Sequence, residues 1–264
     1  VVLALGVQRM ARESAIVKQL SSVETLGSAS VISSDKTGTL TRNEMTIQRI
    51  VTASGEVTVT GVGYRPDGEF VTDGKSLEDG PLLEEARAVV NLGSLAGDAS
   101  VREEAGEWNG DPTEAAFLVA RQKAGTVVDL EHRFHRVGEV PFTSERKLMT
   151  TLQEDAERDG RLVIATKGAP DVLLTRCTHE RVGGEPRPLD DERRRQIIAT
   201  VDSLAAQAFR TLGAAYRRLP TAVPDEPEEL SEDLEHELVF AGVVDVMHAD
   251  HAVAHSTQGL PETR

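Results

Sequence analysis

A continuous apolar run at residues 238–244, Leu-Val-Phe-Ala-Gly-Val-Val, places the strongest constraint on the fold. A strand that is apolar at successive positions is buried on both of its faces, as in the centre of an α/β sheet. Residues 28–33, Ser-Ala-Ser-Val-Ile-Ser, form a shorter and partly β-branched run. Strands indicated between these two runs alternate polar and apolar residues instead. The sequence therefore predicts an α/β domain that is interrupted after its first strand and re-entered near Leu238.

The interrupting segment has the pattern of an α+β domain with an antiparallel sheet. We predict strands at residues 45–51, 56–60, 137–142, 147–153, 161–166 and 211–216. Helices are predicted at residues 81–95, 111–123 and 191–209, the last with its apolar residues on one face. The acidic, proline-containing residues 220–237 are predicted to be a solvated connector. Near the start of the chain, apolar spacing over residues 2–20 predicts a further helix.

The charge balance limits the classes of partner. Among 264 residues, 44 are acidic and 29 are basic, which gives a formal net charge of −15. Such a surface repels the phosphates of nucleic acids, so we expect no nucleic-acid partner. A bound polyphosphate would need a local device, such as Mg²⁺ or one placed lysine, to offset this field.

Cysteine content and hydropathy bear on the compartment. Cys177 is the single cysteine, so no intrachain disulfide can form, and we expect a buried thiol in a reducing compartment. The longest apolar opening, residues 1–6, is too short to cross a bilayer and lacks the features of a signal peptide. We interpret it as the end of a longer segment.

The sharpest chemical signal follows the first apolar run, where residues 34–41 read Ser-Asp-Lys-Thr-Gly-Thr-Leu-Thr. A carboxylate at Asp35 could attack the terminal phosphorus of ATP and form an acyl phosphate. Lys36 offers a cation and Thr37 a hydroxyl and a backbone amide, which suits the electrostatic demands of phosphoryl transfer. On these residues alone, Asp35 could equally be part of a capped turn.

These eight residues are identical to the signature of the P-type ATPases, and the chain resembles that family over most of its length. Residues 15–18 and 23–27 resemble the stalk of the type II, calcium-pump-like branch. The resemblance implies a HAD-like (Rossmann-type) phosphorylation domain interrupted by a nucleotide-binding domain. It also implies that Asp35 is phosphorylated, that Lys36 and Thr37 assist, and that Asp35 and Thr37 hold Mg²⁺.

A second segment, residues 167–170, reads Lys-Gly-Ala-Pro after a predicted strand. By itself it is typical of a plain strand-to-helix turn. It resembles the family's nucleotide-domain motif, which implies that Lys167, Gly168 and Ala169 contact adenosine.

A third segment, residues 140–149, contains Phe142 among polar residues. From the residues alone, a stacking platform for a base and an ordinary core phenylalanine are equally supported. The family resemblance implies that Phe142 stacks on adenine and that Lys147 reaches the nucleotide.

Two further segments carry candidate residues. Asp111, Pro112 and Glu114 have the spacing of a helix start with a capping box, which accounts for them fully. The resemblance adds recognition of the adenine amino group by Glu114. Taken alone, Arg210 could be an ordinary surface charge, but residues 209–212 resemble a segment whose arginine approaches the phosphates, which makes Arg210 and Leu212 nucleotide-binding candidates.

The expected domain limits follow from these matches. We assign residues 1–27 to the stalk helix and the approach to the phosphorylation domain, 28–45 to its first strand and loop, and 46–237 to the nucleotide-binding domain. Residues 238–247 are expected to be the return strand of an incomplete phosphorylation domain, and 248–264 an unrecognised tail. The family's Asp-Pro-Pro-Arg, Gly-Asp-Gly-x-Asn-Asp and Thr-Gly-Glu motifs and its ion-binding helices are not found.

We therefore expect the ATP-handling, cytoplasmic portion of a membrane cation pump, with ATP and Mg²⁺ as cofactors. By itself this portion is expected to bind ATP without transport and to phosphorylate Asp35 slowly or not at all. The transported cation would be handled by the parent protein's membrane helices. Two alternatives remain: a non-catalytic nucleotide-binding module, and a phosphatase of the HAD superfamily, which Thr37 disfavours because that class usually has a second aspartate there.

Overall fold

The computed structural model describes residues 2–12, 17–19, 28, 30–31, 41–61, 63–102, 107–125, 129–207, 210–222 and 232–250. The chain divides into two units, Val1–Leu40 and Thr41–Arg264, and each is described by itself. Within the described ranges, no helix has the length and apolar character that crossing a bilayer requires.

Among its described residues, the first unit contains helix α1 (Val2–Arg12), with Arg9 and Arg12 in its last turn, where the helix dipole favours cations. The helix expected over residues 2–20 is shorter, since residues 17–19 are not helical. Ser14, Ile16 and Val17 follow α1 in the sequence, and serine and β-branched residues lower helix propensity.

The buried strand expected at residues 28–33 is wrong at its centre. Ser30 and Val31 are not in a strand, and Val31 is 81% exposed. A short apolar strand is stable only when neighbouring elements pair with it and cover it. Asp35, Lys36 and Thr37 lie outside the described residues, as do the other residues of the phosphorylation loop.

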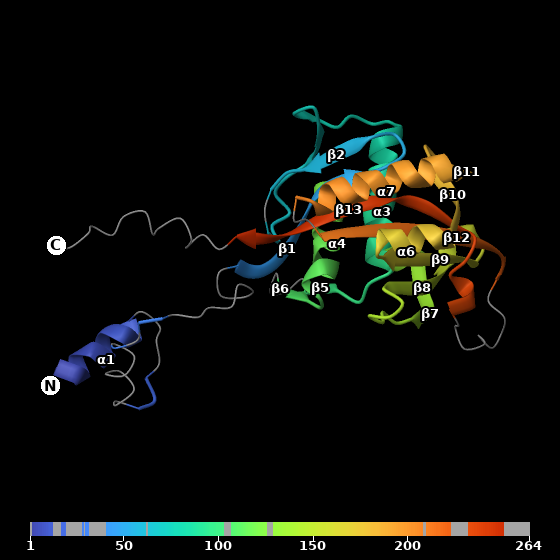
Figure 1. Ribbon diagram of the computed structural model, residues 1–264. Coiled ribbons are helices and arrows are strands. Elements are labelled where there is room, and N and C mark those ends of the chain that lie inside the picture. Colours follow the sequence, from blue (N-terminus) through green and yellow to red (C-terminus); the bar gives the residue numbers. More distant parts are fainter. Residues whose placement is uncertain are drawn as a thin grey trace. The chain divides into compact units, whose positions relative to one another are not determined.

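The second unit is built on an 11-stranded sheet that is antiparallel along its main path (Figure 1). The order is β4 (Lys75–Ser76), β3 (Phe70–Thr72), β2 (Glu56–Val59), β1 (Thr41–Val51), β13 (Leu238–Asp250), β12 (Arg210–Ala222), β9 (Arg161–Gly168), β8 (Leu148–Asp155) and β7 (Phe134–Val140). The hairpin of β10 (Cys177–Val182) and β11 (Glu185–Pro188) joins this sheet by a parallel pairing of β10 with β13. β5 (Ser100–Arg102) and β6 (Glu107–Asn109) form a separate two-stranded sheet. The antiparallel sheet predicted from the alternating strands is confirmed.

Strand β13 corrects the expected domain organisation. Residues 238–247 were assigned to the return strand of a phosphorylation domain, but they lie at the centre of the sheet that the interrupting segment forms. β13 pairs antiparallel with β1 on one edge and with β12 on the other. Residues 41–45, expected with the phosphorylation loop, likewise belong to β1. A continuous apolar run indicates burial on both faces, and a central antiparallel strand covered by helices meets that condition as well as a parallel one.

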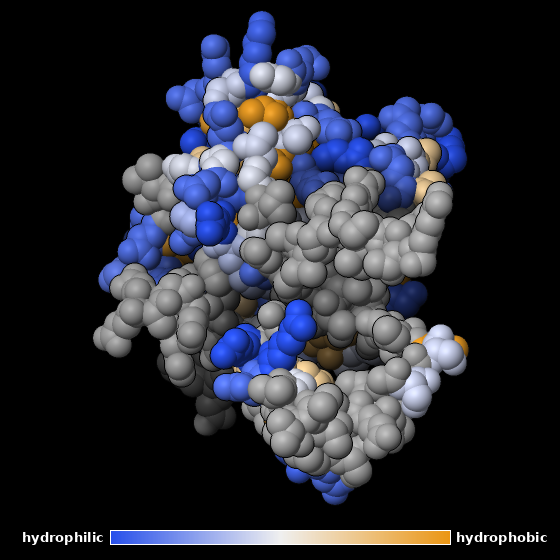
Figure 2. Space-filling model, turned by 90° about the vertical axis from the view of Figure 1, so that its left-hand side faces the viewer, coloured by the Kyte–Doolittle hydropathy of each residue, from blue (hydrophilic) through white to orange (hydrophobic). Residues whose placement is uncertain are grey.

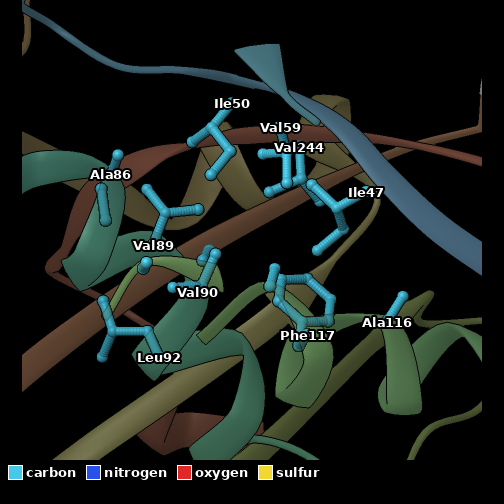
Figure 3. Close-up of a cluster of buried hydrophobic side chains, with 14 of the residues drawn as sticks. Ile47, Ile50, Val59, Ala86, Val89, Val90, Leu92, Ala116, Phe117 and Val244 are labelled. Carbon is cyan, nitrogen blue, oxygen red and sulfur yellow. The ribbon is translucent and has the colours of Figure 1, made fainter. Parts of the chain in front are cut away.

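Helices cover both faces of the sheet (Figure 1). α3 (Pro81–Leu95) and α4 (Pro112–Lys123) pack on one face over a core that includes Ile47, Ile50, Phe117 and Val244 (Figure 3). α6 (Pro170–Arg176) and α7 (Asp191–Ala205) pack on the other face over a second core. Successive residues of β13 serve opposite cores, with Val243 in the second and Val244 in the first. The shorter elements are α5 (Leu130–Arg133), η1 (Ala156–Arg158) and η2 (Glu232–Leu234).

The sequence located most of these elements. The helix predicted at residues 81–95 matches α3, and that at 111–123 matches α4 with Asp111 as its N-cap. α7 begins where predicted but ends at Ala205, four residues before the expected 209.

The solvated connector expected at residues 220–237 is only partly correct. β12 continues to Ala222, and Glu235 is completely buried. Density of acidic residues predicts exposure on average. It does not reveal one carboxylate that has a buried cation as its partner.

Candidate functional site

A pocket of about 370 Å³ lies in the second unit, where the starts of α4, β8 and β12 meet the end of β9. It is lined by Asp98, Gly110, Asp111, Thr113, Glu114, Pro141, Phe142, Met149, Lys167, Gly168, Arg210 and Leu212. Six of these residues are nucleotide-binding candidates from the sequence, namely Glu114, Phe142, Lys167, Gly168, Arg210 and Leu212. The structure thus brings together four segments that are distant in the chain.

The base of the pocket is an ion pair between Lys167 and Glu114. Lys167 Nζ lies 2.7 Å from Glu114 Oε1, and the two side chains are 10% and 13% exposed. Lys167 stands near the end of β9, and Glu114 in the first turn of α4. Burial lowers the pKa of Lys167, and the neighbouring carboxylate of Glu114 opposes this shift by favouring the charged ammonium.

The start of α4 fixes the direction of Glu114. Asp111 is the N-cap, and its side chain accepts a hydrogen bond of 2.8 Å from the backbone N–H of Thr113. The capping box expected with Glu114 is not formed. Glu114 Oε2 accepts instead from the backbone N–H groups of Asp98, at 2.8 Å, and Ala99, at 3.1 Å. The buried Lys167 ammonium and these two N–H groups give the carboxylate more favourable partners than the helix terminus does.

Sequence reasoning missed Arg136, which holds the segment between α3 and β5. Its guanidinium is 2.5 Å from Asp98 Oδ1 and also donates to the backbone carbonyl of Gly97. Gly97 is in close contact with the ion pair, since a Cβ there would come within 2.8 Å of Lys167 Nζ. Arg136 therefore anchors the backbone that supplies the N–H groups to Glu114.

Phe142, Met149 and Leu212 form an apolar wall of the pocket. Phe142 is 55% exposed, whereas Met149 is buried and Leu212 half-buried. The alternative that Phe142 is an ordinary core residue is therefore wrong. Of the described residues, only Val31 and Phe142 are large hydrophobic side chains exposed to solvent. The described surface visible in Figure 2 is mostly hydrophilic. An exposed aromatic ring on a pocket rim is suited to packing against a planar apolar group.

Gly168 lets two backbone segments approach closely beside the pocket. A Cβ at this position would lie 2.1 Å from the carbonyl oxygen of Lys147. The same carbonyl accepts a hydrogen bond of 3.1 Å from the backbone N–H of Ala169. Lys147 and Ala169 do not line the pocket, although both lie at this junction. Lys147 is exposed and has a left-handed backbone conformation with φ of 58°.

Arg210 gives the pocket a second basic side chain. It is exposed at the first position of β12, two residues before Leu212. The lining residues thus combine an apolar wall, a buried lysine with its carboxylate partner and an exposed arginine. Such a set is suited to a ligand with a flat apolar part and an anionic part.

Comparison with known protein families decides the assignment. Residues 85–247 match the model of the P-type ATPase, cytoplasmic domain N. This chain belongs to the P-type ATPase family. The match includes the pocket's ion pair, its apolar wall and residues 238–247 of the central strand β13.

Curated relatives agree with this assignment. The chain is 38% identical over 251 residues to a calcium-transporting ATPase of Bacillus subtilis, which covers 93% of this chain and 27% of that protein. It is 37% identical over 258 residues to the cation-transporting ATPase pma1 of Synechocystis, covering 92% of this chain and 27% of that protein. It is 38% identical over 237 residues to the probable cation-transporting ATPase F of Mycobacterium tuberculosis. That alignment covers 87% of this chain and 25% of that protein. The chain thus spans about a quarter of the length of the curated relatives it matches.

Proposed function

We propose that this N domain binds ATP in the pocket at the start of β8 and the end of β9, and that it serves a cation-transporting P-type ATPase. The observation that carries the proposal is the convergence of Glu114, Phe142, Lys167 and Arg210 on one cavity. These residues come from different elements, and the family resemblance had named them independently of any geometry.

The pocket supports a specific orientation of the nucleotide. Adenine packs against Phe142, with Met149 and Leu212 completing an apolar contact. Glu114 and Lys167 at the base provide a hydrogen-bond acceptor and a donor for the polar edge of the ring. Gly168 lets the ligand approach the backbone.

The phosphates extend towards the basic side chains at the edge of the pocket. Arg210 is exposed there, and its fork of N–H donors suits phosphate oxygens. Lys147 and Ala169 remain proposed nucleotide contacts, since their segment adjoins Gly168 without lining the cavity.

In the whole pump we propose that Asp35 is the phosphate acceptor. Its carboxylate oxygen attacks the γ-phosphorus, the bond from that phosphorus to the bridging oxygen breaks, and ADP leaves; water later hydrolyses the acyl phosphate. Lys36 and Thr37 would stabilise charge during the transfer. The carboxylate of Asp35 and the carbonyl of Thr37 are hard oxygen donors of the kind Mg²⁺ prefers, and the ion would neutralise the phosphate oxygens.

The relatives' names include calcium-transporting and cation-transporting ATPases. We therefore propose that the parent protein transports a cation, Ca²⁺ being one candidate, across a membrane. The N domain would lie on its cytoplasmic side, as the name of the family model implies. Whether ATP phosphorylates Asp35 distinguishes the pump from the two alternatives, a phosphatase and a non-catalytic nucleotide-binding module.

Two experiments test the proposal. Equilibrium dialysis with labelled Mg-ATP should show saturable binding that adenosine and ADP displace and inorganic phosphate does not. If inorganic phosphate displaced ATP as effectively as adenosine does, the proposed orientation of the adenine would be contradicted. In the full-length protein, ATP should give a hydroxylamine-sensitive phosphoenzyme that Asp35→Asn abolishes. A phosphoenzyme that persists in this variant would exclude Asp35 as the acceptor.

A further inference from the structure

The Phe142 loop, which we define as residues 141–147, contains a buried arginine. The Arg146 side chain is 7% exposed. Its Nη2 atom donates to the carbonyl oxygens of Pro141, at 2.6 Å, and Leu148, at 2.8 Å, with Val140 at 3.2 Å. The guanidinium therefore joins the two ends of the loop whose exposed ring forms the pocket wall.

The counter-ion of this arginine comes from a distant part of the chain. Glu235 Oε2 lies 3.2 Å from Arg146 Nε, in an ion pair that is not an aligned hydrogen bond. Glu235 follows η2 and precedes β13 in the sequence, and it is completely buried. Its other oxygen accepts a hydrogen bond of 2.5 Å from Thr150, which is 85 residues away in the sequence. A second carboxylate, Glu232, is 3.7 Å from Arg146 Nη1 but 64% exposed.

The burial of both groups makes each dependent on the other. A buried cation that loses its counter-ion is unfavourable, and it either draws in water or moves towards solvent. Arg146 cannot move without releasing the carbonyl groups of Pro141 and Leu148. Buried backbone carbonyls that lose their donors are unfavourable in turn. The charge on Glu235 is thus linked to the shape of the Phe142 loop.

We propose that Arg146 and Glu235 are positioning residues that hold the Phe142 loop in its nucleotide-binding shape, so that Glu235 controls ATP affinity without contacting ATP. The statement about affinity rests on the proposed nucleotide function, whereas the statement about loop shape does not. The acidic segment before β13 acquires a defined role, because it delivers the carboxylate on which the loop depends.

Calorimetric titration of Mg-ATP tests the link to affinity. Glu235→Gln preserves shape and removes the charge, and it should weaken binding by about 3- to 30-fold, the usual range for coupling through intermediate residues. Glu180→Gln is the matched control, since Glu180 is also buried and ion-paired, to Arg193, but does not line the ATP pocket. It should leave the affinity unchanged. In a Phe142→Ala background, Glu235→Gln should add little further loss. The proposal is overturned if Glu235→Gln binds ATP with wild-type affinity. It is also overturned if Glu235→Gln lowers the affinity equally in wild-type protein and in Phe142→Ala.

Trypsin cleavage after Lys147 gives a readout that does not depend on nucleotide. The Lys147 side chain is exposed, but its backbone N–H donates to the Thr143 carbonyl at 2.7 Å and its carbonyl accepts from Ala169 at 3.1 Å, so cleavage requires the loop to open. Glu235→Gln and Arg146→Lys should accelerate this cleavage severalfold over wild type, and Glu180→Gln should not. Unchanged cleavage in Glu235→Gln would refute the role in loop shape. If cleavage accelerates as expected but wild-type protein binds no ATP, the proposed function fails while the loop assignment stands.

Discussion

Lys167 Nζ and Glu114 Oε1 lie 2.7 Å apart at the base of the pocket, although the two residues are 53 positions apart in the sequence. Two backbone N–H groups, of Asp98 and Ala99, hold the second oxygen of Glu114. The nucleotide that we propose would therefore meet polar groups that are already oriented. Preorganisation of this kind reduces the ordering that binding requires.

Removing one partner of this pair should destabilise the domain more than removing both. Glu114→Gln leaves the Lys167 ammonium buried without a counter-ion, which should lower the free energy of unfolding by about 3 kcal/mol. The double variant Glu114→Gln/Lys167→Met also removes the ammonium charge and should therefore lose less free energy of unfolding. Urea denaturation measures both. If the stability lost in the double variant equalled the sum of the losses in Glu114→Gln and Lys167→Met alone, the result would argue against a coupled pair.

Nucleotide affinity should fall at high pH because Lys167 loses its proton. Burial places the pKa of Lys167 below the ordinary value of 10.5, so the ammonium is present at low pH and lost as pH rises through the lowered pKa. As pH rises, the nucleotide affinity of wild-type protein should therefore begin to fall before pH 10.5 is reached. Lys167→Met should bind weakly at every pH over the same range. Affinity that stays constant up to pH 10.5 in wild-type protein would contradict a role for the charge.

Gly168→Ala should destabilise the junction beside the pocket. The added Cβ would lie 2.1 Å from the carbonyl oxygen of Lys147, so the backbone of one strand must shift. We expect a loss of about 1–3 kcal/mol, as is typical of overpacking. Gly184→Ala is the control, because a Cβ there has no atom within 4 Å. Thermal unfolding should separate the two variants, and equal midpoints would show that the junction tolerates the added carbon.

Cys177 should be unreactive towards thiol reagents in the folded protein. It is 1% exposed, and burial raises the pKa of its thiol to about 12. The thiolate is the reactive form, so labelling should proceed only as fast as the domain opens. Ellman's reagent should react slowly in buffer and completely in urea. Rapid stoichiometric labelling at neutral pH without denaturant would show that this part of β10 is open.

Local patterns predicted the elements well where the signal was itself local. α3 begins at Pro81, a residue suited to the first helical turn, and its apolar spacing extends to Leu95. Strands β2 and β9 were found from their alternation or their β-branched content. The pattern of β13 was detected but misassigned, since burial on both faces does not distinguish a parallel from an antiparallel neighbour.

The candidate site was predictable as a set of residues but not as a network. Family resemblance named Glu114, Phe142, Lys167 and Arg210, yet the pairing of Glu114 with Lys167 required the fold. Arg136 and Glu235 were missed because each acts through a partner far away in the sequence. A charged residue in a polar stretch has no local signature of burial, so only tertiary structure identifies such positions.

Calorimetric titration of Mg-ATP into wild-type protein and Phe142→Ala tests the central claim most directly. The Phe142 ring is exposed, so its removal should leave the fold intact and weaken binding about tenfold through loss of stacking. Phe134→Ala, which removes a half-buried ring outside the pocket, should bind as wild type does. Saturable binding that only Phe142→Ala weakens is the predicted result. No saturable binding by folded wild-type protein, or equal affinity in Phe142→Ala, would contradict the assignment of this pocket to ATP.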